Sequence, residues 1–186
     1  MPLVPPDDAR PAPEWDVTRW FNHPGPLRLA DHRGQVVVVH AFQMLCPGCV
    51  LHGIPQAQRI EATFSSSGVV VVGLHTVFEH HAAMSPVALE AFLHEYRVGF
   101  PVGVDAPATG PVPATMAAYE MRGTPTLLLI DREGRLRLHA FGKVDDMAVG
   151  AAIATLLGEP IQRHEVSSST RGDAKRCADA CLVDPS

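Results

Sequence analysis

The sequence lacks the features that mark several classes of protein. No stretch of its 186 residues approaches the ~20 apolar residues of a membrane span, so we expect no membrane partner. Its 15 lysines and arginines are scattered and the net charge is −5, which argues against a nucleic-acid partner. Residues 1–14 hold acids and prolines instead of a basic start and an apolar run. We therefore expect no secretory signal and a cytoplasmic protein.

Metal-ligand spacing is also missing among the ten histidines, and we expect no metal and no cofactor. The chain is long enough for one domain with a full core. Residues 1–14 are rich in proline, and residues 159–186 lose hydrophobic periodicity. We therefore expect a flexible arm at 1–14, one domain at 15–158, and a flexible tail at 159–186 that carries Cys177 and Cys181.

Two of the four cysteines lie where a strand meets a helix. The four valines at 36–39 predict a strand buried on both faces, because β-branched residues suit a pleated surface. The motif Cys-Pro-Gly-Cys follows at 46–49, and from there the apolar pattern becomes helical to about residue 64. We therefore expect a CxxC motif at the N-terminus of a helix.

This placement suits thiol chemistry. With Cys46 near the N-cap, Pro47 falls at the first helical position, which tolerates the missing N–H of proline. The free N–H groups of the first turn and the helix dipole favour the thiolate of Cys46. Cys49 lies within disulfide range, where it can resolve a mixed disulfide. A CxxC motif can also supply half of a zinc site, and this alternative stays open.

A second motif, Arg-Gly-Thr-Pro-Thr at 122–126, precedes the apolar run at 127–130. Together the two motifs resemble the thioredoxin superfamily, in its TlpA/ResA-like and AhpC/TSA (peroxiredoxin-like) branch, over roughly residues 15–158. The resemblance implies an α/β thioredoxin-like fold, with a central mixed β-sheet flanked by helices. It also implies an N-terminal hairpin and an inserted helix. The alternation at 27–29 predicts a short strand, Ser85 followed by proline predicts the start of the inserted helix, and we expect a short edge strand at 100–104.

The same resemblance implies the chemistry. A thiol–disulfide oxidoreductase of this family would attack with Cys46, resolve with Cys49, and carry a cis peptide bond between Thr124 and Pro125. Pro47, Thr124 and Pro125 would contact the substrate, because a cis proline exposes the preceding backbone for β-like pairing. The expected partners are a disulfide-containing protein or small molecule and a thiol reductant. The oligomeric state is not indicated.

Three positions depart from the family pattern. Leu45 stands where thioredoxin relatives have a tryptophan before the first cysteine. His40 and His52 stand where relatives carry acids, six residues before Cys46 and three residues after Cys49. Imidazole exchanges protons near neutral pH, so either histidine is a candidate proton relay. Both also suit purely structural roles.

Two other functions remain as alternatives. A peroxiredoxin-like thiol peroxidase would need the motif PxxxTxxC, but Val39 and Gln43 stand where its proline and threonine belong. A non-enzymatic zinc module could combine the CxxC pair with Cys177 and Cys181. These two tail cysteines could also relay electrons to the CxxC pair, or be incidental.

Overall fold

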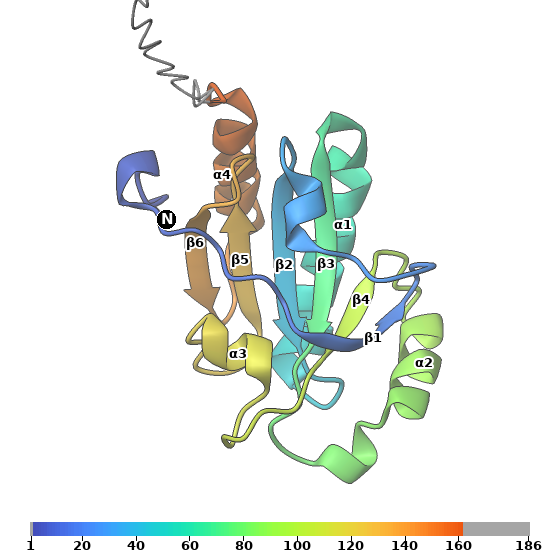
Figure 1. Ribbon diagram of the computed structural model, residues 1–186. Helices are drawn as coiled ribbons and strands as arrows, with labels where there is room; N and C mark the ends of the chain where they lie inside the picture. The colour runs from blue at the N-terminus through green and yellow to red at the C-terminus, as the bar shows by residue number, and fades with distance from the viewer. Residues whose placement is uncertain (1, 162–186) are drawn as a thin grey trace, which may run out of the picture.

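The structure is a computed structural model that describes residues 2–161. Within these residues six strands form one mixed sheet in the order β1-β4-β3-β2-β5-β6 (Figure 1). The strands are β1 (Val17–Phe21), β2 (Val36–Phe42), β3 (Val69–His75), β4 (Val102–Asp105), β5 (Thr126–Ile130) and β6 (Leu136–Phe141). The α-helices are α1 (Ile54–Phe64), α2 (Pro86–Glu95), α3 (Ala114–Ala118) and α4 (Asp146–Gly158).

The sheet is covered on both faces, as the valine-rich strand predicts. Helices α1 and α4 pack on one face, while α3 and the chain before β1 cross the other (Figure 1). Every residue of β2 is buried. Its side chains alternate between two cores: Val38 and Phe42 face α1 and α4, whereas Val37 and Val39 pack with Trp15 on the opposite face.

The sheet register brings the two sequence motifs together. Strand β2 is parallel to β3 through the α1 crossover and antiparallel to β5. Ala41, near the end of β2, is paired with Thr126, the first residue of β5. The segment that precedes β5 therefore lies beside the segment that follows β2. These two segments contain Thr124-Pro125 and the CxxC motif.

The predicted N-terminal hairpin is wrong. β1 is antiparallel to β4, far away in the sequence, and residues 27–29 form no strand. Leu29 instead begins a 3₁₀ turn, Leu29–His32, because the Glu14 carboxylate accepts the backbone N–H groups of Leu29 and Ala30. The pairing with β1 also means that β4 is not an edge strand. The inserted helix α2 is confirmed, with Ser85 accepting the Ala88 N–H as its N-cap.

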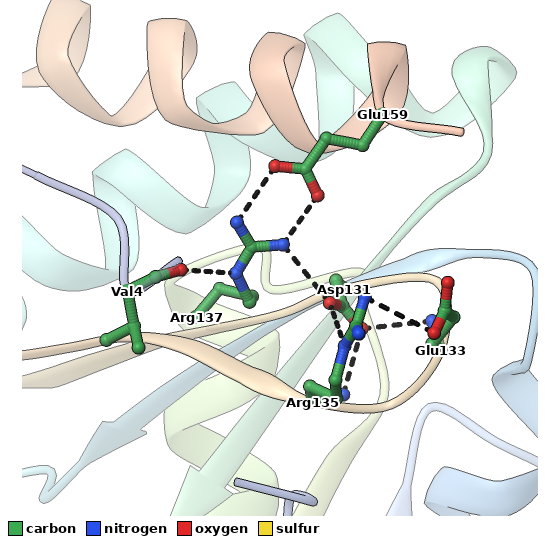
Figure 2. Close-up of polar contacts among 6 residues, drawn as sticks. All are labelled: Val4, Asp131, Glu133, Arg135, Arg137 and Glu159. Carbon is green, nitrogen blue, oxygen red and sulfur yellow. Dashed lines mark hydrogen bonds and ion pairs between the residues drawn. The ribbon is translucent and has the colours of Figure 1, made fainter. Parts of the chain in front are cut away.

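The N-terminal arm, expected to be flexible, is docked on the edge strand β6. The Val4 N–H donates to the Arg137 carbonyl oxygen at 2.8 Å, and the Ala12 N–H donates to that of Gly134 at 2.9 Å. Figure 2 shows the buried Arg137 guanidinium between the Val4 carbonyl, Glu159 and Asp131. Polar groups of β6 thus hold the arm and the end of α4.

The remaining predictions on the tail fall on residues 162–186, which lie outside the described residues, as do Cys177 and Cys181. Glu159, the first residue of the predicted tail, belongs to the folded domain through its ion pair with Arg137. Across residues 2–161, no helix combines the length and apolarity that crossing a bilayer requires.

Candidate active site

Cys46 lies between the end of β2 and the first helical turn. Pro47 begins the helix, as predicted. The backbone N–H of Cys49 donates to the Cys46 sulfur at 3.2 Å. The Cys46 thiol donates to the Thr124 carbonyl oxygen at 3.5 Å. These contacts hold a partly exposed sulfur at a helix N-terminus, the environment that activates cysteine thiols.

Cys49 has a different environment. Its side chain is fully buried, and both cysteines of the motif are free thiols. Burial, together with the hydrogen bond to the Cys46 thiol, raises the pKa of Cys49 to about 12. An incoming sulfur can therefore reach Cys46 more readily than Cys49.

The Thr124-Pro125 segment faces the CxxC turn, and its peptide bond is cis, as predicted. The Pro125 ring packs so closely on Gly48 that a Cβ at position 48 would lie 3.2 Å from Pro125 Cδ. Two further hydrogen bonds fix the segment: Gly142 N–H donates to the Pro125 carbonyl oxygen at 2.8 Å, and Thr126 Oγ1 donates to that of Gly123 at 2.7 Å. The absence of a side chain at Gly48 thus leaves room for the Pro125 ring.

His40, one of the two candidate relays, is buried on the α1 face of β2. Burial lowers its pKa to about 4, so the imidazole is neutral at physiological pH. Its Nε2 has no hydrogen-bond partner among residues 2–161. The ring lies against Gly53, where any Cβ would clash with it. His40 therefore occupies its place only because residue 53 has no side chain.

His52, the second candidate, is exposed on the first turns of the CxxC helix. Both histidines line a cavity of about 300 Å³ behind that helix. Pro125 also lines this cavity, which therefore adjoins the CxxC site. The other lining residues come from the helix, from β5, from the segment between β6 and α4, and from the first residue of α4: Gly53, Gln56, Arg59, Leu127, Gly142, Lys143, Val144, Asp145 and Asp146.

The helix of the CxxC motif contains a π-helical segment, Cys49–Gly53, that the sequence reasoning missed. The Ile54 N–H donates to the Cys49 carbonyl oxygen, five residues back, instead of the usual four. Pro55 follows directly and has no N–H to donate. The sequence signal was Pro55 itself.

Phe141 is a second residue that the sequence reasoning missed. Its side chain is 49% exposed, and a Cβ on Gly123 would lie 3.0 Å from its ring. The Arg122 guanidinium lies 5.5 Å from the ring centroid, in a cation–π contact. Leu45, before the first cysteine, is 57% exposed. Exposed apolar side chains therefore occur beside both motifs. The sequence carries no local signal for Phe141, because its place beside the Arg-Gly-Thr-Pro-Thr motif depends on its pairing with Thr126 between β6 and β5.

Comparisons with known proteins identify the family and the fold of the chain. The model of the AhpC/TSA family matches residues 9–139. A crystal structure of a thioredoxin-like superfamily protein is 62% identical, with a TM-score of 0.81 over 83% of this chain and 100% of that chain. A thiol-disulfide isomerase from Corynebacterium glutamicum is 51% identical, with a TM-score of 0.78 over 83% of this chain and 99% of that chain. The thioredoxin-like fold predicted from the sequence is confirmed.

A curated relative is much longer than this chain. NHL repeat-containing protein 2 of Gallus gallus is 28% identical over 128 residues, which are 67% of this chain and 16% of that protein. The chain thus corresponds to a small part of that relative.

Proposed function

Since the chain belongs to the AhpC/TSA family of the thioredoxin superfamily, we propose that it is a thiol–disulfide oxidoreductase whose redox centre is Cys46 and Cys49. The observation that carries the proposal is the difference between the two sulfurs. Cys46 is accessible at a helix N-terminus, and Cys49 is buried one turn later with a raised pKa. This is the arrangement expected of an attacking and a resolving thiol.

In the reducing direction, the Cys46 thiolate attacks one sulfur of a substrate disulfide, and the other substrate sulfur leaves as a thiolate. Cys49 then attacks Cys46 in the mixed disulfide, which forms the Cys46–Cys49 disulfide and releases the second substrate thiol. The backbone beside Pro125 would pair with an extended substrate segment. Pro47, exposed beside Cys46, would contact the same segment. The substrate class is accordingly a polypeptide with an accessible disulfide.

Cys49 has to lose a proton before it attacks, and the two candidate histidines differ in burial: His40 is buried, whereas His52 is exposed. Burial lowers the pKa of His40 to about 4, which makes its imidazole a weak base. His40 is therefore a poor direct acceptor. We assign the proton relay to His52, which is exposed and lines the same cavity. His40 stays neutral and lines the cavity without taking up the proton.

Gln43 favours disulfide exchange over the peroxidase alternative. It stands where a peroxidatic threonine would be needed, and it is buried. Its amide oxygen accepts the Phe78 N–H at 3.3 Å, and its amide nitrogen lies 3.4 Å from Glu79. The side chain is thus engaged by the segment after β3.

The zinc alternative rests on cysteines outside the described residues. Within residues 2–161 no group of three or more histidine, cysteine or acidic side chains is arranged to hold a metal ion. Metal analysis of reduced full-length protein, with and without Cys177 and Cys181, tests that alternative directly.

The proposal is tested by turnover of insulin disulfides with dithiothreitol as reductant. Cys46→Ser should abolish the catalysed rate, and Cys49→Ser should remove most of it while a mixed disulfide accumulates. Cys177→Ser/Cys181→Ser is the matched control and should keep the rate. A Cys46→Ser protein as active as the parent would contradict the assignment.

A further inference from the structure

The cavity behind the CxxC helix has acceptors that are already occupied. The Asp146 carboxylate accepts from Gln56 Nε2 at 2.7 Å and from Arg59 Nε at 2.9 Å. Asp145 Oδ1 accepts the backbone N–H of Ala148 at 3.0 Å, as the N-cap of α4. Both acids of the cavity wall are therefore engaged with protein groups.

Several hydrogen-bond donors that line the same cavity have no partner, within the described part of the chain, for at least one of their N–H groups. Arg59 bonds Asp146 through Nε and Nη2, which leaves Nη1. Lys143 is exposed and makes no ion pair within residues 2–161, although its charge helps to lower the pKa of Asp146. His52 makes no hydrogen bond within the same range, and the buried Nε2 of His40 has no partner there. The cavity-lining groups that are still able to bind a ligand are thus mainly the cationic side chains and the imidazoles.

The size and position of the cavity limit the ligands that it can bind. A volume of about 300 Å³ is at the lower end of small-molecule sites. Pro125 lines the cavity and packs on Gly48, and the carbonyl of the preceding Thr124 contacts the Cys46 sulfur. A small molecule in the cavity would therefore have one end near the redox centre.

We propose that this cavity binds the carboxylate of a low-molecular-weight thiol, which serves as the reductant of the Cys46–Cys49 disulfide. This inference rests on the proposed function and names its electron donor by chemical class. Lys143 provides the charge that is unpaired within residues 2–161 and Arg59 a free Nη1 group, since the rest of its guanidinium is paired with Asp146. His40 and His52 provide additional polar contacts around the carboxylate.

The chemistry balances with two molecules of thiol. The first thiolate attacks Cys46, the Cys46–Cys49 bond breaks, and Cys49 leaves and takes up a proton, as its raised pKa requires. A second thiolate attacks the donor sulfur of the mixed disulfide and releases Cys46 as a thiolate. Two thiols are oxidised to one small disulfide, and the protein disulfide is reduced to a dithiol.

The test compares an anionic thiol with a neutral thiol. The rate constants for reduction of the oxidised full-length protein are measured with glutathione and with 2-mercaptoethanol, and their ratio is compared between variants. Lys143→Gln should lower the glutathione to 2-mercaptoethanol ratio by about fivefold, the effect of a partly exposed charge pair. Lys143→Glu should lower it further. S-methylglutathione, which has no thiol, should inhibit the glutathione reaction of the parent protein more strongly than that of Lys143→Glu.

The control is Arg28→Gln, which removes the same charge from an exposed residue that does not line the cavity. Its ratio should equal that of the parent protein. Equal ratios in the parent, Lys143→Gln and Lys143→Glu would overturn the inference. Reduction by dithiothreitol separates this failure from failure of the proposed function. If dithiothreitol reduces the Cys46–Cys49 disulfide but neither lysine variant loses the preference for glutathione, only the carboxylate site is refuted.

Discussion

The imidazole of His40 lies directly against the Cα of Gly53, so that a strand residue and a residue of the π-helical segment depend on each other. Gly53→Ala should lower the free energy of unfolding by about 1–3 kcal/mol, because the new methyl group overpacks the His40 ring. Chemical denaturation measures this change.

Gly150→Ala in α4 is the matched control, because a Cβ there meets no atom within 4 Å. It should be neutral or slightly stabilising. In the double variant His40→Ala/Gly53→Ala, the penalty of the alanine at 53 should largely disappear. If Gly53→Ala is as stable as Gly150→Ala, the described packing of His40 is wrong.

The two thiols should differ in alkylation. In a Cys177→Ser/Cys181→Ser background, iodoacetamide should modify Cys46 at pH 7 at least tenfold faster than Cys49, since Cys49 is buried and its pKa is about 12. The rate at Cys49 should still be rising with pH above about pH 10. Mass spectrometry of each single Cys→Ser variant gives the rates. Similar rates at neutral pH would remove the distinction between the two sulfurs.

Acid should destabilise the protein through two buried histidines. Burial lowers the pKa of His40 and of His75 from 6.5 to about 4. Between these pH values the unfolded chain binds protons that the folded chain does not, so the free energy of unfolding falls as the pH drops through this window. The loss reaches about 3 kcal/mol for each histidine at most.

This pH dependence is measured as the difference in unfolding free energy between pH 7 and pH 4.5. His40→Asn and His75→Asn should each reduce that difference. His94→Asn removes an exposed histidine of α2 and should leave it unchanged. An undiminished difference in the double variant His40→Asn/His75→Asn would disprove the assignment to these residues.

The fold of the active-site region was predictable because its signals are local. The valines at 36–39, the proline at 47 and the Ser85-Pro86 start of α2 each act within a few residues. The cis bond at Thr124-Pro125 followed from the family motif. What failed was non-local: the pairing of β1 with β4 and the docking of the arm on β6 depend on contacts between distant segments.

Arg137 illustrates why the docked arm could not be foreseen. In a strand with alternating apolar residues, an arginine at this position predicts an outward side chain, yet Arg137 is 2% exposed. Its partners, Val4 and Glu159, lie 133 and 22 residues away in the chain. Burial of this charge is possible only after all of these segments have come together.

Removing that arginine should be costly. Arg137→Met leaves the buried Asp131 and the partly buried Glu159 with one cation fewer, and we expect a loss of about 3 kcal/mol in unfolding free energy. The exposed pair of Arg10 and Glu120 is the comparison, and Arg10→Met should cost less than about 1 kcal/mol. Thermal and chemical denaturation of both variants give the values. Equal losses would mean that the network in Figure 2 contributes no more than a surface ion pair.

Trapping of mixed disulfides tests the central claim most directly. Cys49→Ser, in the Cys177→Ser/Cys181→Ser background, is incubated with a disulfide-containing polypeptide, and the adduct is mapped by mass spectrometry. The account predicts a stable adduct on Cys46, because Cys46 attacks and the resolving thiol is missing. It also predicts no comparable adduct on Cys49 in the Cys46→Ser protein, since that sulfur is buried. Adducts that form on Cys49 but not on Cys46 would contradict the account.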